Sequence, residues 1–210
     1  MVLHGYYRST AAWRVRIALN LKGIAAEQRS RHLRRGEQRA PDYLRLNPQG
    51  LVPALETDDG AVLTQSLAIC EWLDETHPAP PLLPGDALRR AHIRAVAQAI
   101  ACDIHPVQNL KVLNRLRGLE LSDAEVTDWA QWVIADGLAA CEALVAGGEG
   151  PFCFGDAPTL ADLCLVPQLF NARRFGVALD GYARLLAAEG ACASVAAFAD
   201  AAADRQADAE

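Results

Sequence analysis

The sequence predicts two unlike halves: an α/β domain with a mixed four-stranded sheet and covering helices, followed by an all-α domain. Two observations support this prediction. Short β-like runs alternate with helical patterns in residues 1–77, whereas the pattern beyond residue 86 is almost entirely helical. Between them, residues 78–85 contain four prolines, which exclude a regular helix and indicate a stiff linker. We therefore expect domains at residues 1–80 and 86–210.

The first half opens with an apolar run, Val2–Tyr7, that predicts a strand. Trp13–Lys22 carries apolar residues at helical spacing and is followed by Gly23, which is typical of a helix end. Ala26–Leu33 is a weaker strand candidate, and the polar segment Pro41–Leu46 predicts a short helix.

Two further strands and a helix complete the first half. Ala54–Thr57 and Ala61–Leu63 flank a turn, Asp58–Gly60, whose Asp-Gly pair is a hairpin signal. Ser66–Thr76 then has the pattern of a helix. The resulting order β-α-β-α-β-β-α favours a mixed sheet covered by helices.

The second half predicts three main helices, Ala87–Leu116, Asp123–Ala146 and Thr159–Phe175, and weaker alanine-rich helices to the end of the chain. Pro106 should kink the first of these helices, because proline has no N–H to donate. At the start of the third helix, Thr159 and Asp162 have the spacing of a capping box.

Composition and charge limit the classes of function. The chain has 210 residues, 51% apolar and 22% charged, as in an ordinary globular protein; only the polar tail Asp204–Glu210 suggests disorder. A net charge of −6 argues against general nucleic-acid binding. The basic residues between Arg29 and Arg39 lack interleaved aromatics, so we expect a solvated face or loop there. No apolar run is long enough to span a bilayer.

The six cysteines form no C-x-x-C pair and no zinc-binding spacing with histidine, so no metal site is predicted. They lie in apolar segments, which favours buried reduced thiols. Arg8, Arg14 and Arg16 interrupt the first twenty residues, so no secretory signal peptide is expected. We therefore expect a cytoplasmic, reducing compartment.

The turn before the first helix, Arg8-Ser9-Thr10, is the strongest candidate for chemistry. A helix N-terminus exposes unpaired N–H groups and a partial positive charge, which stabilise an anion such as a thiolate. The hydroxyls of Ser9 and Thr10 could donate hydrogen bonds to that sulfur. Alternatively, one of them only caps the helix, and one hydroxyl could serve both roles.

Two further positions in the first half suit a peptide-like ligand. Val52-Pro53 directly precedes a strand, where a cis bond would leave the Val52 backbone open to an extended ligand; a turn is the alternative. Gln65 and Ser66 open a helix and could bind a ligand carboxylate as neutral donors. The alternative is that Ser66 is a plain N-cap.

In the second half, His105, Asn109 and Lys111 lie close together in the sequence around Pro106. They suggest a rim that faces a ligand or substrate, and a purely structural histidine is the alternative. Near another helix end, Arg174 could clamp a carboxylate, or it could only complement the helix dipole.

Together these segments resemble the zeta class of the glutathione transferases, and the resemblance covers nearly the whole chain. Its most specific element is the run Arg8–Leu19. Any one element alone is a weak signal, whereas all of them in order are specific. The supporting elements are Asn47-Pro48 with Leu51-Val52-Pro53, Gln65–Ile69, Gly155-Asp156 with Thr159–Gln168, and Asn171–Phe175.

The resemblance implies a thioredoxin-like first domain, an all-helical second domain and, usually, a homodimer that binds glutathione. Ser9 would hydrogen-bond the glutathione sulfur, and Val52, before a cis Pro53, would pair with the cysteinyl backbone. Arg8 and Arg174 would face the carboxylates of a small dicarboxylic substrate. The other implied glutathione contacts are Gln65 and Ser66 at the γ-glutamyl end, Gln38 at the glycyl part, and His105 and Asn109 at the pocket border.

The implied activity is glutathione-dependent isomerisation of maleylacetoacetate to fumarylacetoacetate by thiolate addition, bond rotation and elimination, a step of aromatic amino acid catabolism. Arg8 would stabilise the negative charge that develops on the substrate. Maleylpyruvate is the alternative substrate. A transferase that conjugates electrophiles or α-haloacids, and a non-enzymatic interaction module, are the alternative functions. Animal relatives often carry Ser-Cys where this chain has Thr10-Ala11, so a mechanism that needs a protein thiol at Ala11 is excluded.

Overall fold

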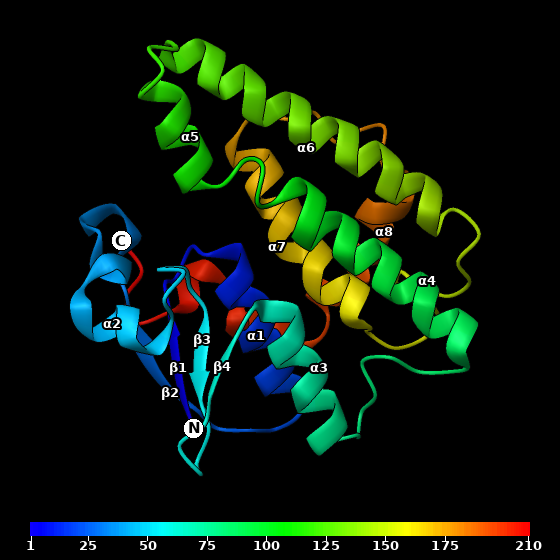
Figure 1. Cartoon of the computed structure of the whole chain (residues 1–210). Coiled ribbons are helices and arrows are strands. Elements are labelled where there is room, and N and C mark those ends of the chain that lie inside the picture. The colour runs from blue at the N-terminus through cyan, green and yellow to red at the C-terminus, as the bar shows by residue number, and fades with distance from the viewer. The chain divides into compact units, whose positions relative to one another are not determined.

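The computed structural model describes all residues, 1–210, which form two compact units. The first unit is Met1–Leu82 together with Ala193–Glu210, and the second is Leu83–Cys192 (Figure 1). The change from the first unit to the second, after Leu82, falls inside the proline-rich segment that predicts a linker.

A four-stranded mixed sheet forms the centre of the first unit, as predicted. Its strands are β1 (Val2–Gly5), β2 (Glu27–Ser30), β3 (Ala54–Glu56) and β4 (Val62–Thr64), in the order β2-β1-β3-β4. β1 runs parallel to β2 and antiparallel to β3, and β3 and β4 form the antiparallel hairpin that the Asp-Gly turn predicts. Because β1 is an interior strand, the chain enters the next helix from the middle of the sheet.

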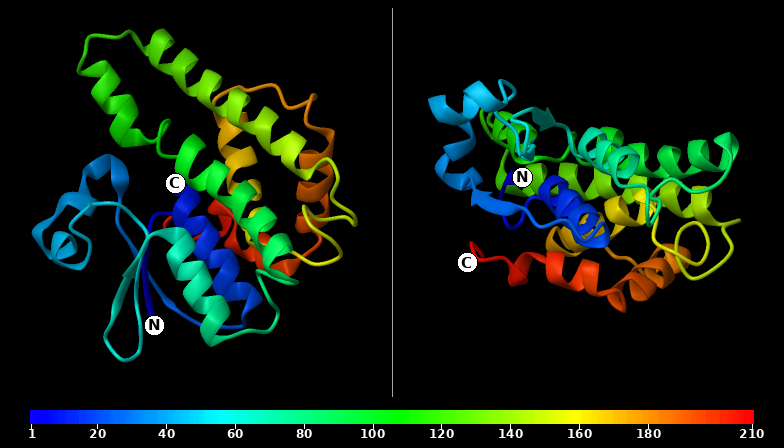
Figure 2. Two further views of the ribbon diagram at one scale, coloured as in Figure 1. Left: turned by 45° about the vertical axis from the view of Figure 1, so that its right-hand side comes forward. Right: turned by 90° about the horizontal axis from the view of Figure 1, so that it is seen from below.

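Two helices of the first unit begin close to strand ends. α1 (Thr10–Leu21) follows β1, and α3 (Ser66–Thr76) follows β4; the two helices pack against each other (Figure 2). The short helix α2 (Pro41–Leu46) starts at a proline, which suits a first turn because no N–H is needed there. These elements agree with the predicted order, and they place the starts of α1 and α3 in one unit.

The end of the chain, residues 193–210, belongs to the first unit and not to the helical half that the sequence indicated. There α9 (Ala196–Ala201) packs against α1 and buries Phe198. The backbone carbonyl of Ala201 accepts a hydrogen bond from the side chain of Arg16 in α1. The apolar face of this alanine-rich helix is therefore covered by α1, a long-range contact that local periodicity does not reveal.

The second unit is all helical, as predicted. α4 packs against α6 and α7. No helix of the structure is both long enough and apolar enough to cross a membrane. The helices are α4 (Ala87–Gln98), α5 (Leu110–Arg117), α6 (Asp123–Val145), α7 (Leu160–Arg174) and α8 (Ala183–Ala193).

The prediction of one kinked helix over Ala87–Leu116 is wrong. α4 gives way to a π-helical segment, Ala99–Ile104, and then to a turn that contains Pro106, before α5 begins. The proline therefore breaks the helix. α6 also approaches this segment closely: a Cβ on Gly137 would lie 2.2 Å from Cγ1 of Ile104, so only glycine allows this packing.

Capping boxes start two helices of the second unit. The predicted box at α7 is confirmed: the fully buried Asp162 accepts hydrogen bonds from the N–H groups of Thr159 (2.8 Å) and Cys153 (2.9 Å). A second box, formed by Ser122 and Glu125, starts α6. Each carboxylate accepts from the N–H of its N-cap residue, one of the groups that a helix start leaves unpaired.

The cysteines are free thiols, and five of the six are buried as expected. Cys102 is exposed, contrary to that expectation, because only one face of the π-helical segment packs against the rest of the unit. Burial raises the pKa of the Cys141 thiol to about 12, so this thiol stays protonated at neutral pH.

Candidate functional site

Ser9 is the N-cap of α1. Its backbone is extended (φ −70°, ψ 114°), and its Oγ accepts a hydrogen bond from the N–H of Ala12 at 3.2 Å. The expectation that a hydroxyl of this turn caps the helix is therefore correct. Because the hydroxyl oxygen acts as an acceptor in this bond, its own proton remains available for donation to a second group.

Thr10 adds a second hydroxyl at the start of α1. The residue is 5% exposed, and its Oγ1 has no hydrogen-bond partner in the structure. A buried hydroxyl without a partner is uncommon and unfavourable. The first turn of α1 contains no acidic residue, so no carboxylate of the helix's own first turn neutralises the positive end of its dipole. Ser9 and Thr10 therefore form a donor set that suits an anion such as a thiolate.

Arg8 precedes these hydroxyls and is half-buried. Its Cζ lies 5.5 Å from the centroid of the Tyr7 ring, within cation–π range. Arg16 holds the same turn from inside, since its Nη2 donates to the carbonyl of Tyr7 at 2.8 Å. Burial lowers the pKa of Arg16 to about 10, so the guanidinium remains charged at neutral pH. The turn thus carries an arginine and two hydroxyls on a fixed backbone.

The Val52–Pro53 peptide bond is cis, as the resemblance implies. The loop before it is fixed at Leu51, whose carbonyl accepts hydrogen bonds from the Tyr43 hydroxyl at 2.6 Å and from the Asn47 amide at 2.7 Å. Val52 itself is half-buried just before β3. Its pairing with a ligand stays a prediction.

The start of α3 differs from the expected one. Gln65 is the N-cap, with an unusual φ of 69° and no hydrogen bond from its side chain to the helix; its Nε2 donates to Gln49 at 3.0 Å. Ser66 is the first helical residue, so the alternative that it is the N-cap is wrong. The Ser66 Oγ accepts a hydrogen bond from Nη1 of Arg14 at 3.2 Å. α3, like α1, has no acidic residue in its first turn.

Arg14 is a buried cation that the sequence analysis did not consider as a candidate for the site. It is 1% exposed and bonds Ser66, yet its Nε and Nη2 have no hydrogen-bond partner. A buried guanidinium with two unused donors attracts a negative group strongly. The available signal was an arginine inside the otherwise apolar start of the first helix. Arg14 links α1 to the start of α3, and both helix starts now suit an anionic ligand.

Gln38 lies in a short 3-10 turn, Glu37–Arg39, in the same unit. It is half-buried, and its Oε1 has no hydrogen-bond partner. An acceptor without a partner agrees with a ligand contact, and the assignment to glutathione stays a prediction.

In the second unit, His105, Asn109 and Lys111 follow the π-helical segment. The N–H of His105 donates to the carbonyl of Ile100 at 2.9 Å. Asn109 is the N-cap of α5, because its Oδ1 accepts from the N–H of Val112 at 3.1 Å; the sequence analysis did not identify this cap. Lys111 is exposed in the first turn of α5. These three residues therefore lie on the segment between the π-helical stretch and the first turn of α5, and their contact with a ligand stays a prediction.

Arg174 is exposed at the end of α7, and its Cζ lies 4.9 Å from the centroid of the Phe175 ring. Phe175 packs against an apolar cluster that includes Leu113 of α5, so the end of α7 is anchored next to that helix. The neighbouring Arg173 forms a bidentate pair with Glu189, with both distances 2.5 Å. The two arginines therefore have different environments, and the substrate role of Arg174 stays a prediction.

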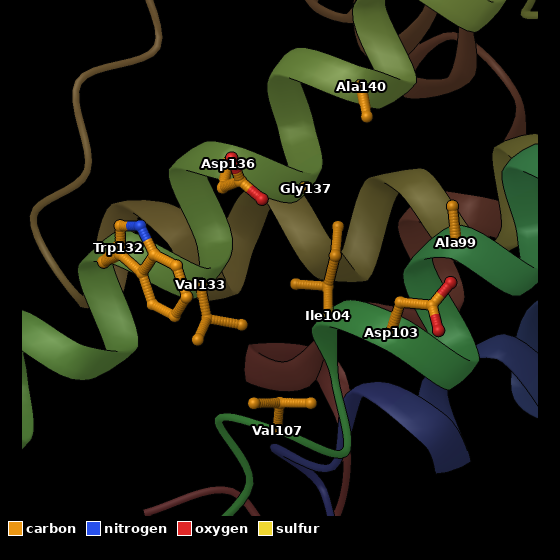
Figure 3. Close-up of a pocket in the computed structure, with 9 residues that line it drawn as sticks. All are labelled: Ala99, Asp103, Ile104, Val107, Trp132, Val133, Asp136, Gly137 and Ala140. Atoms are coloured by element: carbon orange, nitrogen blue, oxygen red, sulfur yellow. The ribbon is translucent and has the colours of Figure 1, made fainter.

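A cavity of about 260 Å³ lies within the second unit, between the π-helical segment and α6 (Figure 3). Ile104, Val107 and Val133 form its apolar lining, and Asp103 and Asp136 supply its carboxylates. None of the predicted site residues lines this cavity.

Comparison with known families agrees with the fold. Residues 8–76 match the family described as glutathione S-transferase, N-terminal domain, and residues 133–188 match glutathione S-transferase, C-terminal domain. Maleylacetoacetate isomerase of Pseudomonas aeruginosa is 52% identical over 187 residues, which cover 88% of this chain and 87% of that protein.

Solved structures extend the likeness. The holo structure of maleylpyruvate isomerase, a bacterial zeta-class glutathione S-transferase, has a TM-score of 0.97 and 44% identity, and covers 100% of both chains. Maleylacetoacetate isomerase from Anaeromyxobacter dehalogenans, solved with dicarboxyethyl glutathione and citrate in its active site, has a TM-score of 0.89 and 46% identity over 100% of this chain and 97% of that one. The chain therefore belongs to the glutathione S-transferase family, and within it to the zeta class.

Proposed function

We propose that the protein is a glutathione-dependent isomerase that converts maleylacetoacetate to fumarylacetoacetate. The observation that carries this proposal is the start of α1. There the Ser9 hydroxyl accepts from Ala12 and keeps its proton for donation, and the buried Thr10 hydroxyl has no partner. The activity named for the similar proteins supports the same reaction.

Glutathione has a thiol in its middle and carboxylates at both ends, and the first unit offers matching groups. Ser9 would face the thiol, and the backbone of Val52 would pair with the cysteinyl part. The γ-glutamyl carboxylate would bind at the start of α3, where Arg14 adds a buried positive charge. The remaining contacts that we propose are Gln65, Ser66, Gln38, His105 and Asn109.

When bound, glutathione supplies a thiol that adds reversibly to the activated double bond, so that rotation about this bond becomes easy. A free thiol of the cysteine type has a pKa of about 8.5, and a hydroxyl donor at a helix N-terminus lowers this pKa. Arg8 would stabilise the negative charge that develops on the substrate. Arg174 and Lys111 would bind substrate carboxylates. Ala11 has no thiol, so a mechanism that needs a protein thiol at this position is excluded.

A direct assay tests this proposal. Purified protein is given maleylacetoacetate or maleylpyruvate, with and without glutathione, and both the cis substrate and the free thiol are followed. Isomerisation predicts loss of the cis acid with constant free thiol, only when glutathione is present. Consumption of thiol in step with substrate would instead identify a conjugating transferase, and no change in either would refute an enzymatic role on these acids.

Ser9→Ala tests the role of the hydroxyl. We expect it to raise the apparent pKa of bound glutathione, because the thiolate loses a donor while α1 keeps its dipole. The thiolate absorbance is titrated against pH for wild type and variant, with Ser9→Thr, which keeps a hydroxyl at this position, as the control. An unchanged titration in the serine variant would show that Ser9 acts only as a cap.

Maleylpyruvate is the second candidate substrate, because a zeta-class structure of that name shares the whole fold at 44% identity. Both acids carry a cis double bond between a carbonyl and a carboxylate. The ratio of kcat/KM for the two acids in the assay above decides between them.

We also propose a homodimer in a reducing, cytoplasmic compartment. The free cysteines agree with a reducing environment. Sedimentation of the purified protein tests the oligomeric state, because a monomer at micromolar concentration would contradict it.

A further inference from the structure

The tail that the sequence analysis expected to be disordered is bound to the candidate site. Asp208 accepts two hydrogen bonds on its Oδ2, one from the backbone N–H of Tyr7 at 3.1 Å and one from the hydroxyl of Ser30 at 2.6 Å. Tyr7 immediately precedes Arg8 in the chain. The tail carboxylate therefore contacts the backbone of the turn that carries the candidate catalytic residues.

The other side of Tyr7 is held by the same end of the chain. Its carbonyl accepts from Nη2 of Arg16 at 2.8 Å, and the Nε of this arginine donates to the carbonyl of Ala201 at 3.1 Å. Arg16 is 5% exposed, so these bonds are shielded from water. Both peptide groups of Tyr7 are thus fixed by contacts that involve residues 193–210.

A second carboxylate anchors the tip of the tail. Glu210 lies 3.0 Å from Nε2 of His32 and 3.3 Å from Nη2 of Arg35. His32 Nδ1 accepts from the N–H of Arg35, which places the proton of the neutral ring on Nε2, directed at Glu210. The basic stretch that was expected to be a solvated face therefore binds, in part, the acidic end of its own chain.

We propose that Asp208 is a positioning residue for the isomerase, which fixes the Tyr7-Arg8-Ser9 turn so that Arg8 and Ser9 meet substrate and thiol in the right geometry. A hydrogen bond from an N–H to a carboxylate is among the stronger ones in proteins. The Arg8 guanidinium lies over the Tyr7 ring, so a shift of Tyr7 moves Arg8 with it. This inference rests on the proposed function, because it assigns Arg8 and Ser9 their roles there.

The test compares four variants of the full chain. Asp208→Ala removes the acceptor, Asp208→Glu displaces it by one methylene, and Asp208→Asn keeps an acceptor oxygen without the charge. Asp204→Ala, which removes an exposed carboxylate from the same tail, is the matched control. Two quantities are measured for each: the hydrogen-exchange rate of the Tyr7 amide, and kcat and KM for isomerisation at saturating glutathione.

We expect Asp208→Ala and Asp208→Glu to speed exchange of the Tyr7 amide and to lower kcat by about tenfold, because small misplacements of catalytic groups have effects of at least this size. Asp208→Asn should restore kcat to within about threefold of wild type, and Asp204→Ala should leave both quantities unchanged. If Asp208→Ala does not fold, the exchange rate of the Tyr7 amide and the kcat of Asp208→Glu test the proposal instead.

A faster Tyr7 exchange with kcat within twofold of wild type would overturn the positioning role. An equal loss of kcat in the Asp204 and Asp208 variants would overturn it too. A wild-type protein without isomerase activity would refute the proposed function instead, and the exchange rates would still report whether Asp208 holds the turn.

Discussion

In the second unit, α6 and α7 each begin with a capping box whose carboxylate accepts from the N–H of the N-cap residue. In the first unit, α1 and α3 begin without any acidic residue in the first turn. Around these two starts lie the partnerless hydroxyl of Thr10 and the two unused donors of Arg14. The starts of α6 and α7 therefore have a carboxylate of their own, whereas the starts of α1 and α3 leave donors without an acceptor.

This difference follows from the helix dipole. A helix start that contains its own carboxylate is stabilised, but its N–H groups and positive end are no longer available to a ligand. A start that has only hydroxyls and a buried arginine nearby retains that capacity. α6 and α7 thus begin in a way that favours stability, and α1 and α3 begin in a way that favours anion binding.

The largest expected effect is on stability, at the buried box of α7. Asp162→Ala would leave the N–H groups of Thr159 and Cys153 without an acceptor, at a cost of about 3 kcal/mol or more in unfolding free energy. Urea unfolding measures this loss, and Asp162→Asn, which keeps one acceptor oxygen, should lose less. The affinity of the variant for glutathione should be unchanged when it is measured without denaturant, at a temperature at which the variant is folded. A loss below about 1 kcal/mol would contradict the importance of the box.

Arg14→Met should have the opposite pattern: a loss of glutathione affinity without a loss of stability. The buried guanidinium has two unused donors, so an apolar side chain of similar length should leave the unfolding free energy unchanged or raise it. Glutathione affinity should fall about tenfold, since the start of α3 loses its buried positive charge. Calorimetry with glutathione, together with urea unfolding, measures both quantities. A destabilised protein with unchanged affinity would show that Arg14 is purely structural.

Ala68→Glu would place a carboxylate in the first turn of α3, which has none in the wild-type protein. Ala68 is exposed at the third helical position, where a carboxylate would neutralise the helix end and repel an anionic ligand. We expect glutathione affinity to fall about fivefold. The neutral variant Ala68→Gln is the control and should bind like wild type. Equal affinities of the two variants would argue against anion binding at α3.

Local sequence signals predict much of the fold. The bounds of Pro41–Leu46 and Ser66–Thr76 agree with α2 and α3, because a proline at the first position and clear helical spacing mark them. The helix predicted over Ala87–Leu116 is wrong because the π-helical segment and the turn with Pro106 break it, whereas the apolar periodicity continues through the break.

The site is predicted less completely. The local pattern predicts that Ser9 or Thr10 caps the first helix, since a hydroxyl residue before an apolar helix is a typical N-cap, and the structure shows that the cap is Ser9. The positive φ of Gln65 moves the N-cap of α3 away from Ser66, and no residue preference indicates this. Asp208 contacts Tyr7 across 201 positions of the chain, so only the folded structure reveals that contact.

The smallest expected effect concerns the surface box of α6. Hydrogen bonds from Ser122 lower the pKa of the Glu125 carboxyl, so the folded state binds this proton less tightly than the unfolded state does. The stabilisation is therefore present above about pH 4.3 and is lost as the pH falls below it. Glu125→Gln should be less stable than wild type at pH 7, and this difference should shrink at pH 3, as measured by urea unfolding at both values. If the difference in unfolding free energy between wild type and variant is the same at both pH values, the carboxylate charge does not stabilise this helix start. The contrast between helix starts with and without a capping carboxylate would then depend on hydrogen bonds alone.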